Sequence, residues 1–211
     1  QHTREYAAHL ASLGDSSERL DASALRDLTV TDYYECGLYT PGTAMIQPAL
    51  FEREVAAGLK SNRVSVYENS PVTSLSRNGV WMAETPNGAV AAPKVILGVN
   101  GHAYSFGHFR GRLLHVSSYG SMTRALTAEY TRRLGGAPRW GATSAEPMGT
   151  TGRRISGTGG DRIIVRNRFT CDPSMKVAAG RIDRVARDHD RAFARRFPAL
   201  AGVEMEYRWG G

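Results

Sequence analysis

The sequence has little cysteine, little lysine and no long apolar segment. Its two cysteines, Cys36 and Cys171, lie far apart in the sequence, which favours a reduced, cytoplasmic setting over a disulfide. No apolar run approaches the roughly 20 residues needed to span a membrane, so no membrane partner is expected. Its histidines, such as His102 and His108, are not spaced with a carboxylate as metal ligands, so no metal site is predicted.

Positive charge exceeds negative charge, with a formal net charge of +7. Nearly all of this charge is arginine, spread along the chain, and the densest cluster, 181–196, falls on a predicted helix that also carries aspartates. That pattern is typical of a solvated helix face. A nucleic-acid-binding domain is suggested by charge alone, because the chain has no recognition-helix motif and no aromatic and basic sheet pattern. We therefore expect no nucleic-acid partner.

The stretch 63–100 predicts several short strands. Residues 64–68 and 72–75 read as strands, and Asn78-Gly79 and Asn87-Gly88 are turns on either side of an alternating strand. The near-continuous apolar run 94–100 is typical of a strand buried on both faces. The small residues that follow it would let backbone N–H groups approach a phosphate.

Helical spacing and capping residues predict five helices. They are expected at 2–13, 20–25 with Asp21 as cap, 48–60 beginning at Pro48, 127–134 with Thr127 as cap, and 178–196. Further strands are predicted at 33–39, 113–122 and 203–208, with a hairpin at 151–166. His189 falls on the apolar stripe of the last helix, which favours a core histidine over a catalyst. The predicted class is α+β, a mixed, mostly antiparallel sheet flanked by helices, plus a small β-meander.

The order of these motifs resembles the glycine oxidase/D-amino acid oxidase family of FAD-dependent oxidoreductases, and within it the gamma-glutamylputrescine oxidoreductases. The resemblance covers most of the chain and depends on motifs in register, no one of which is diagnostic. The matching residues are Gly42, Ile46-Gln47-Pro48, Val66-Tyr67-Glu68, Val72, Thr85, Gly88, Val90, Ala92, Val95-Ile96-Leu97, Asn100, 197–203 and 207–211.

The resemblance also implies what the chain lacks. Family members open with a strand, a Gly-x-Gly-x-x-Gly loop and a helix that hold the FAD pyrophosphate, and they end with a second glycine-rich segment. Neither is present, so the chain is expected to be an internal fragment whose meander would pack on a missing Rossmann-like FAD domain. The implied parts are 1–62, a helical segment with the first substrate-domain strand; 63–102, the meander and a strand of the FAD-binding part; and 103–211, the substrate-binding domain.

Site residues are implied by the same resemblance. Val72, Asn100, Gly101, Trp209 and Gly210 are expected near FAD, and Gln47, Tyr119 and Arg154 near the substrate. Relatives that oxidise amino acids hold the substrate carboxylate with an arginine on the first hairpin strand. Arg154 falls at that position, although strand alternation allows either Arg154 or Arg153 to face the cavity. Relatives carry glycines where this chain has Arg166-Asn167-Arg168, so its pocket and substrate can differ.

The activity implied for the intact parent enzyme is oxidation of a C–N bond of an amine or amino acid, such as a gamma-glutamylputrescine-like substrate of polyamine catabolism, by hydride transfer to FAD. The fragment itself is expected to be inactive and to hold no FAD. No catalytic acid or base is assigned, because direct oxidation of a neutral amine needs none. The alternative is a non-catalytic binding or structural module without bound flavin. Surface left exposed by a missing domain would also favour a homodimer.

Overall fold

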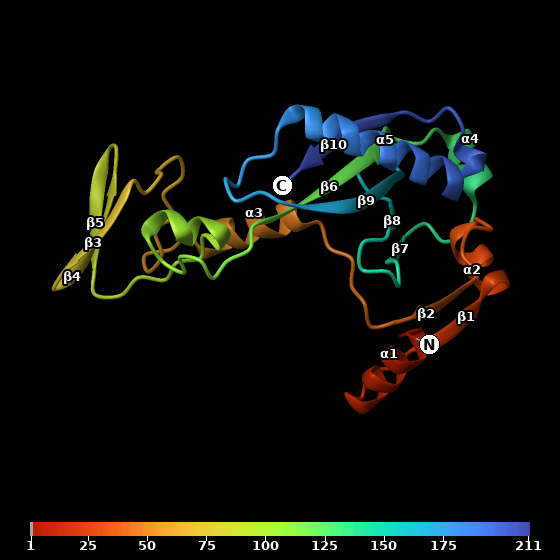
Figure 1. The fold of residues 1–211 in the computed structure, drawn as a ribbon, viewed down its shortest axis with the longest axis horizontal. Helices are drawn as coiled ribbons and strands as arrows, with labels where there is room; N and C mark the ends of the chain where they lie inside the picture. Colours follow the sequence, from red (N-terminus) through yellow and green to blue (C-terminus); the bar gives the residue numbers. More distant parts are fainter. Residues whose placement is uncertain (1) are drawn as a thin grey trace. The chain divides into compact units, whose positions relative to one another are not determined.

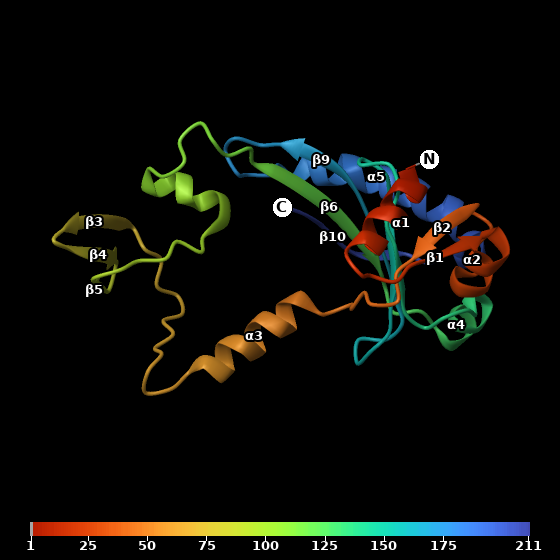
Figure 2. The ribbon, with the colours of Figure 1, turned by 90° about the horizontal axis from the view of Figure 1, so that it is seen from below.

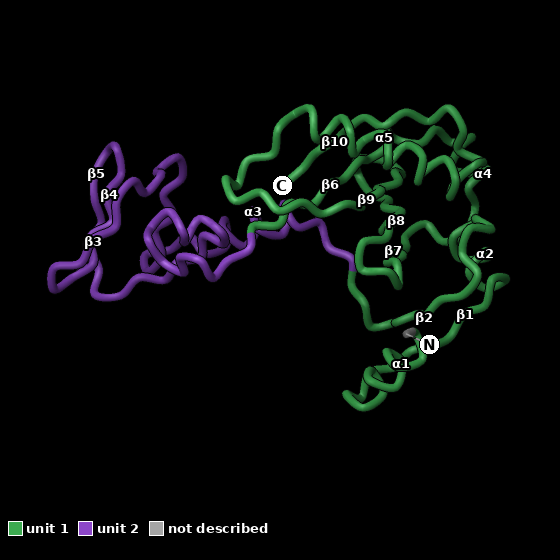
Figure 3. The backbone as a smooth tube through the Cα atoms, in the orientation of Figure 1, with its two compact units in different colours: residues 1–44, 115–211 green, residues 45–114 purple. Residues whose placement is uncertain are grey.

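The chain divides into two compact units in a computed structural model that describes residues 2–211 (Figure 3). Unit 1 comprises Gln1–Ala44 and His115–Gly211, and unit 2 comprises Met45–Leu114. The two units are compact parts of the backbone, whereas the division expected from the sequence is by ligand, FAD or substrate. The three-part division expected from the sequence therefore stays a prediction.

Unit 1 begins with two helices and a two-stranded sheet. Its first elements are α1 (His2–Ser12), β1 (Glu18–Asp21), α2 (Ala22–Thr29) and β2 (Cys36–Tyr39), with β1 and β2 antiparallel. The side chain of Asp21 accepts a hydrogen bond of 2.9 Å from the backbone N–H of Ala24, which confirms it as the cap of α2.

The main sheet of unit 1 is five-stranded and antiparallel, in the order β10-β6-β9-β8-β7. Its strands are β6 (Val116–Thr123), β7 (Trp140–Ala142), β8 (Thr151–Ile155), β9 (Arg162–Cys171) and β10 (Met205–Gly210). The helices of this part are α4 (Ala128–Leu134), α5 (Ala179–Arg196) and the 3-10 helix η2 (Pro198–Leu200). Helix α5 runs along one face of the sheet, where it contacts β6, β9 and β10 (Figures 1 and 2). The predicted hairpin is confirmed as β8 and β9.

The apolar core lies between α5, η2 and the sheet. Ile163 and Val165 on β9 are fully buried and meet Phe193 and Phe197, whose rings lie 5.5 Å apart. Each such side chain stabilises the fold by about 1.5–3 kcal/mol when buried. This packing fixes which face of the sheet is covered.

Unit 2 contains a helix, a meander and a short 3-10 helix. Its elements are α3 (Pro48–Leu59), β3 (Ser74–Asn78), β4 (Val80–Thr85), β5 (Gly88–Ala92) and η1 (Asn100–Phe106). Strands β3, β4 and β5 pair in that order as antiparallel neighbours, which confirms the predicted β-meander. Pro48 occupies the first turn of α3, as its fixed φ favours.

Two strands predicted in unit 2 are wrong. Residues 64–68 form no strand, and 94–99 have no regular structure, with Ile96 95% exposed. An apolar run becomes a buried strand only when neighbouring strands satisfy its backbone, and no described strand pairs with either segment. The strand predicted at 72–75 begins two residues later, at Ser74.

The apolar stripe of α3 is helical, as predicted, but it is exposed. Leu50, Phe51, Val55 and Leu59 are each about half exposed, and α3 has no buried residue. Unit 2 therefore presents apolar surface that its own residues do not cover.

The α+β class is confirmed, with all described strand pairs antiparallel. Among the described helices, none is both long and apolar enough to cross a membrane.

Candidate functional site

The sheet of unit 1 has one face that α5 leaves uncovered, which we call the open face. Residues directly opposite each other in antiparallel strands point to the same side, so the register assigns each side chain to a face. One row across the open face is Tyr207, Met122, Ile164, Arg153 and Gly141, and the next is Trp209, Gly120, Arg166 and Thr151.

At two glycines of this sheet, an aromatic ring of the partner strand occupies the space that a side chain would take. A Cβ at Gly120 would lie 2.3 Å from Cζ2 of Trp209, its cross-strand partner. A Cβ at Gly210 would lie 2.7 Å from the ring of Tyr119, also its cross-strand partner. Trp209 therefore lies on the open face, 43% exposed, and Tyr119 lies on the covered face, 1% exposed. The two expected site residues Tyr119 and Gly210 are in contact.

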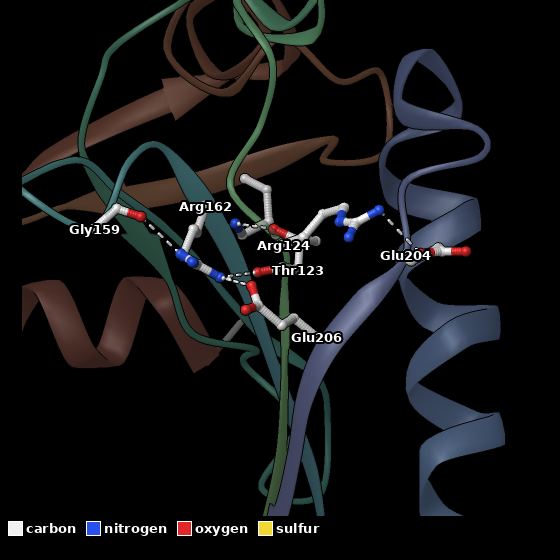
Figure 4. A network of polar contacts seen from close by, with 7 residues as sticks. Thr123, Arg124, Gly159, Arg162, Glu204 and Glu206 are labelled. Atoms are coloured by element: carbon white, nitrogen blue, oxygen red, sulfur yellow. Dashed lines mark hydrogen bonds and ion pairs between the residues drawn. The ribbon is translucent and has the colours of Figure 1, made fainter.

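Arg162 joins three strands at one end of the sheet (Figure 4). Its guanidinium donates to the backbone carbonyl of Thr123 at 2.8 Å and to the carboxylate of Glu206 at 2.5 Å, and its Nε donates to the carbonyl of Gly159 at 2.9 Å. The hydrogen bond from Arg162 is the largest of the causes that hold the pKa of Glu206 below its usual range. This network links β6, β9 and β10.

Arg154 lies on the covered face and not on the open face. Its guanidinium makes a two-pronged contact with Asp161, with distances of 3.2 and 2.6 Å, and also donates to the carbonyls of Gly135 and Ala137. The side chain is 3% exposed. Each of its three guanidinium nitrogens donates to a protein acceptor. The predicted contact between Arg154 and a substrate carboxylate stays a prediction. Of the two neighbouring arginines of β8, Arg153 is the exposed one, and it lies on the open face.

Tyr119 is part of a polar chain beneath the sheet. Its hydroxyl lies 2.7 Å from Oγ1 of Thr170, which donates to Asp172 at 2.6 Å, and Asp172 accepts from Arg181 at 2.6 Å. The hydrogen bond from Thr170 is the largest cause of the lowered pKa of Asp172, while burial opposes it and Arg181 adds to it. These bonds fix the Tyr119 ring against Gly210.

His189 is a core histidine, as its place on the apolar stripe predicts. It is 1% exposed, and its Nδ1 lies 2.8 Å from Oγ of Ser121 on the covered face. Burial lowers its pKa. Among residues 2–211, no group of histidine, cysteine and acidic side chains is arranged to hold a metal ion. Both cysteines are free and exposed.

The remaining expected site residues lie in unit 2. Gln47 is the residue before α3, and its side chain makes no capping hydrogen bond. Val72 precedes β3 and is 40% exposed. Asn100 and Gly101 begin η1, where Asn100 has the left-handed φ of 51°. Within unit 1 the sheet brings Tyr119 and Gly210 into contact on the covered face, and it places Trp209 on the open face.

Two residues of the open face were not among the expected site residues. Arg153 is the alternative to Arg154 that strand alternation leaves open, and Arg166 enters the sequence argument only as a departure from the glycines of relatives. Alternation along β8 and β9 could have paired them, since Thr151 faces Arg166 and Arg153 faces Ile164. That inference needs the register between β8 and β9, which is set by pairing with strands distant in the sequence.

Each unit, taken by itself, offers groups that suit part of an FAD site. In unit 2, Val72 is accessible and a Cβ at Gly98 would meet no atom within 4 Å. In unit 1, Trp209 offers an exposed ring for packing. No Gly-x-Gly-x-x-Gly loop occurs in the sequence to hold a pyrophosphate. That these residues line the cofactor stays a prediction.

Comparison with known proteins is consistent with this geometry. The family model described as DAO, FAD dependent oxidoreductase, matches residues 1–211. No curated protein matches the chain significantly. Among solved structures, glycine oxidase from Geobacillus kaustophilus is similar with a TM-score of 0.70 and 17% identity over 99% of this chain and 54% of that one.

A second similar structure is the open form of NikD, described as an unusual amino acid oxidase essential for nikkomycin biosynthesis. Its TM-score is 0.64 with 20% identity, over 99% of this chain and 55% of NikD. The chain thus spans about half the length of these two proteins. At these identities the structures show the shared fold, and the family model matches every residue. The chain belongs to the DAO family of FAD-dependent oxidoreductases.

Proposed function

We propose that this chain forms the substrate-binding part of an FAD-dependent oxidoreductase that oxidises the C–N bond of an amino acid or amine. The observation that carries the proposal is the open face, where the exposed ring of Trp209 shares a sheet surface with Arg153 and Arg166. An aromatic ring and guanidinium groups suit a small substrate that carries a carboxylate. The printed descriptions of the two similar structures, a glycine oxidase and an amino acid oxidase, support the same class.

The reaction converts the C–N single bond of the substrate to a C=N double bond. A hydride leaves the carbon, and a proton leaves the nitrogen to solvent. FAD, when bound, supplies the electron acceptor. The role of this chain is to bind and orient the substrate: the open face offers cations and rings, and none of the described residues paired on it is a histidine that would move a proton.

The finer assignments are part of this proposal. Val72, Asn100, Gly101, Trp209 and Gly210 would line FAD, and Gln47 would contact substrate. Tyr119 and Arg154 are buried and would act by holding the strands that carry Gly210 and Arg153. A gamma-glutamylputrescine-like substrate, a role in polyamine catabolism and a cytoplasmic location stay predictions.

The test is anaerobic reduction of the flavin. The purified protein is incubated with FAD, freed of unbound cofactor, and mixed with amino acids and amines while its visible absorption is followed. Loss of the oxidised-flavin bands with an amino acid or amine, and not with the matching carboxylic acid, supports the proposal. Bound flavin that no member of the panel reduces contradicts it.

The second candidate function is a non-catalytic binding module. It is favoured by the absence of a Gly-x-Gly-x-x-Gly loop from the sequence. A protein that stays colourless after incubation with FAD but binds carboxylates on its open face would support this alternative.

A further inference from the structure

Two arginines on the open face are close neighbours. Arg166 lies opposite Thr151 and Arg153 lies opposite Ile164, so the two arginines occupy diagonal positions on adjacent strands. Diagonal positions on one face are about 7–8 Å apart, within reach of each other's long side chains. Both side chains are exposed.

The other arginines of this sheet have acidic partners. Arg154 binds Asp161 at 2.6 Å, Arg162 binds Glu206 at 2.5 Å, and Arg208 binds Asp190 at 2.9 Å. Arg168, at the irregular pairing of β9, binds Asp188 on α5 at 2.8 Å.

Arg153 and Arg166 differ from this pattern. Within the part of the chain that the structure describes, the side chain of Arg153 has no hydrogen bond or ion pair, and the contact of the Arg166 side chain is with the ring of Phe169, 5.3 Å from its guanidinium. Like charges on the same face of a sheet repel each other. Two arginines without an acidic partner, on adjacent strands of one candidate binding face, therefore favour an anionic ligand.

The surroundings indicate the size of that ligand. Ile164 lies opposite Arg153, and Met122 lies opposite Ile164 on the next strand. The Trp209 ring covers Gly120, which lies opposite Arg166 on the same face. These side chains offer an apolar surface for a short methylene chain, while each guanidinium can bind one carboxylate in a two-pronged contact. A cationic polyamine tail would be repelled at the same place.

We propose that the substrate carries two carboxylates, as an amino acid with an acidic side chain does, and that Arg153 and Arg166 bind one each. This inference rests on the proposed function, since it names the substrate class of that site. Arg153 and Arg166 are then the residues that determine specificity, in place of a single arginine that binds one carboxylate.

The test compares three small ligands of similar length by isothermal titration calorimetry at constant ionic strength: glutarate, butyrate and 1,4-diaminobutane. One added charge-assisted contact should make glutarate bind at least ~10-fold more tightly than butyrate. The diamine should not compete. In Arg153→Gln and in Arg166→Gln, the ratio of the two affinities should fall to about 1, because each variant leaves one guanidinium.

The matched control is Arg184→Gln on α5. Arg184 is exposed and has no ion-pair partner among the described residues, and its substitution removes the same charge. It should preserve the preference for glutarate. Equal affinities for glutarate and butyrate in the unmodified protein would overturn the inference, as would a preference that survives in Arg153→Gln and Arg166→Gln or that is lost in Arg184→Gln.

The two proposals fail in different ways. Flavin that is reduced by neutral amino acids or amines, in a protein without a dicarboxylate preference, overturns this inference and leaves the proposed oxidation intact. Tight glutarate binding that depends on both arginines, with bound flavin that no amine or amino acid reduces, supports the dicarboxylate site and overturns the proposed oxidation.

Discussion

The indole of Trp209 lies directly over Gly120, its partner on the neighbouring strand. A Cβ at Gly120 would come within 2.3, 2.5 and 2.9 Å of three ring atoms. The absence of a side chain at position 120 thus sets where the ring lies on the open face. In the same pair of strands, the ring of Tyr119 fills the space over Gly210 on the other face.

Gly120→Ala should displace Trp209 and destabilise the protein. Inserting a methyl group into this contact is expected to lower the free energy of unfolding by about 1–3 kcal/mol. Urea denaturation measures the change. Gly157→Ala is the control, because a Cβ there meets no atom within 4 Å. Equal stability of the two variants would show that the ring does not depend on Gly120.

Asp161→Asn should be strongly destabilising, since it leaves the buried guanidinium of Arg154 without its counter-ion. The two side chains are 4% and 12% exposed. Removing one partner of a buried pair costs about 3–5 kcal/mol. The exposed pair Arg26 and Asp32 provides the control, and Asp32→Asn should change stability by less than about 1 kcal/mol. A similar small effect at both sites would mean that Arg154 is not held in the core.

His189 should make stability depend on pH. Burial is the largest cause that lowers its pKa below 6.5; Arg208 adds to this, and Asn167, Asp190 and Asp188 oppose it. Because the unfolded chain binds the proton more readily, the contribution of neutral His189 is present above about pH 6.5 and is lost as the pH falls below that value.

The measurement is denaturant unfolding of the unmodified protein and of His189→Gln between about pH 7.5 and pH 5.5. The difference in unfolding free energy between the two should shrink as the pH falls. A difference that stays constant would indicate that His189 keeps its ordinary pKa. The other five histidines are common to both proteins and cancel in the comparison.

The exposed apolar stripe of α3 should promote self-association, in addition to the surface of the meander from which a homodimer is expected. Phe51 is 57% exposed and lies on that stripe. We expect the average mass in analytical ultracentrifugation to rise with concentration, and to rise less in Phe51→Glu than in the control Glu54→Gln. A protein that stays monomeric at all concentrations would contradict the expected homodimer.

Local chemistry made much of the fold predictable from the sequence. Asp21 and Thr127 cap helices because their side-chain oxygens accept from the first helical N–H groups, and Pro48 begins a helix because its φ is already fixed. The hairpin and the meander follow from turns and alternation. His189 was identified as a core residue from its place on one stripe.

Long-range pairing explains what the sequence did not predict. The run around Ile96 is apolar enough for a buried strand, yet no described strand satisfies its backbone. The choice between Arg153 and Arg154 depends on hairpin register and on Asp161, which lies beyond the end of the first strand. Neither can be inferred from spacing along one strand.

The most direct test of the central claim, that the open face binds substrate, is an NMR titration of the indole N–H groups. The protein has three tryptophans, and Trp209→Phe assigns the resonance of the one on the open face. Addition of glutamate should shift the Trp209 resonance and leave those of Trp81 and Trp140 in place. A Trp209 resonance that does not move at saturating ligand would contradict the account.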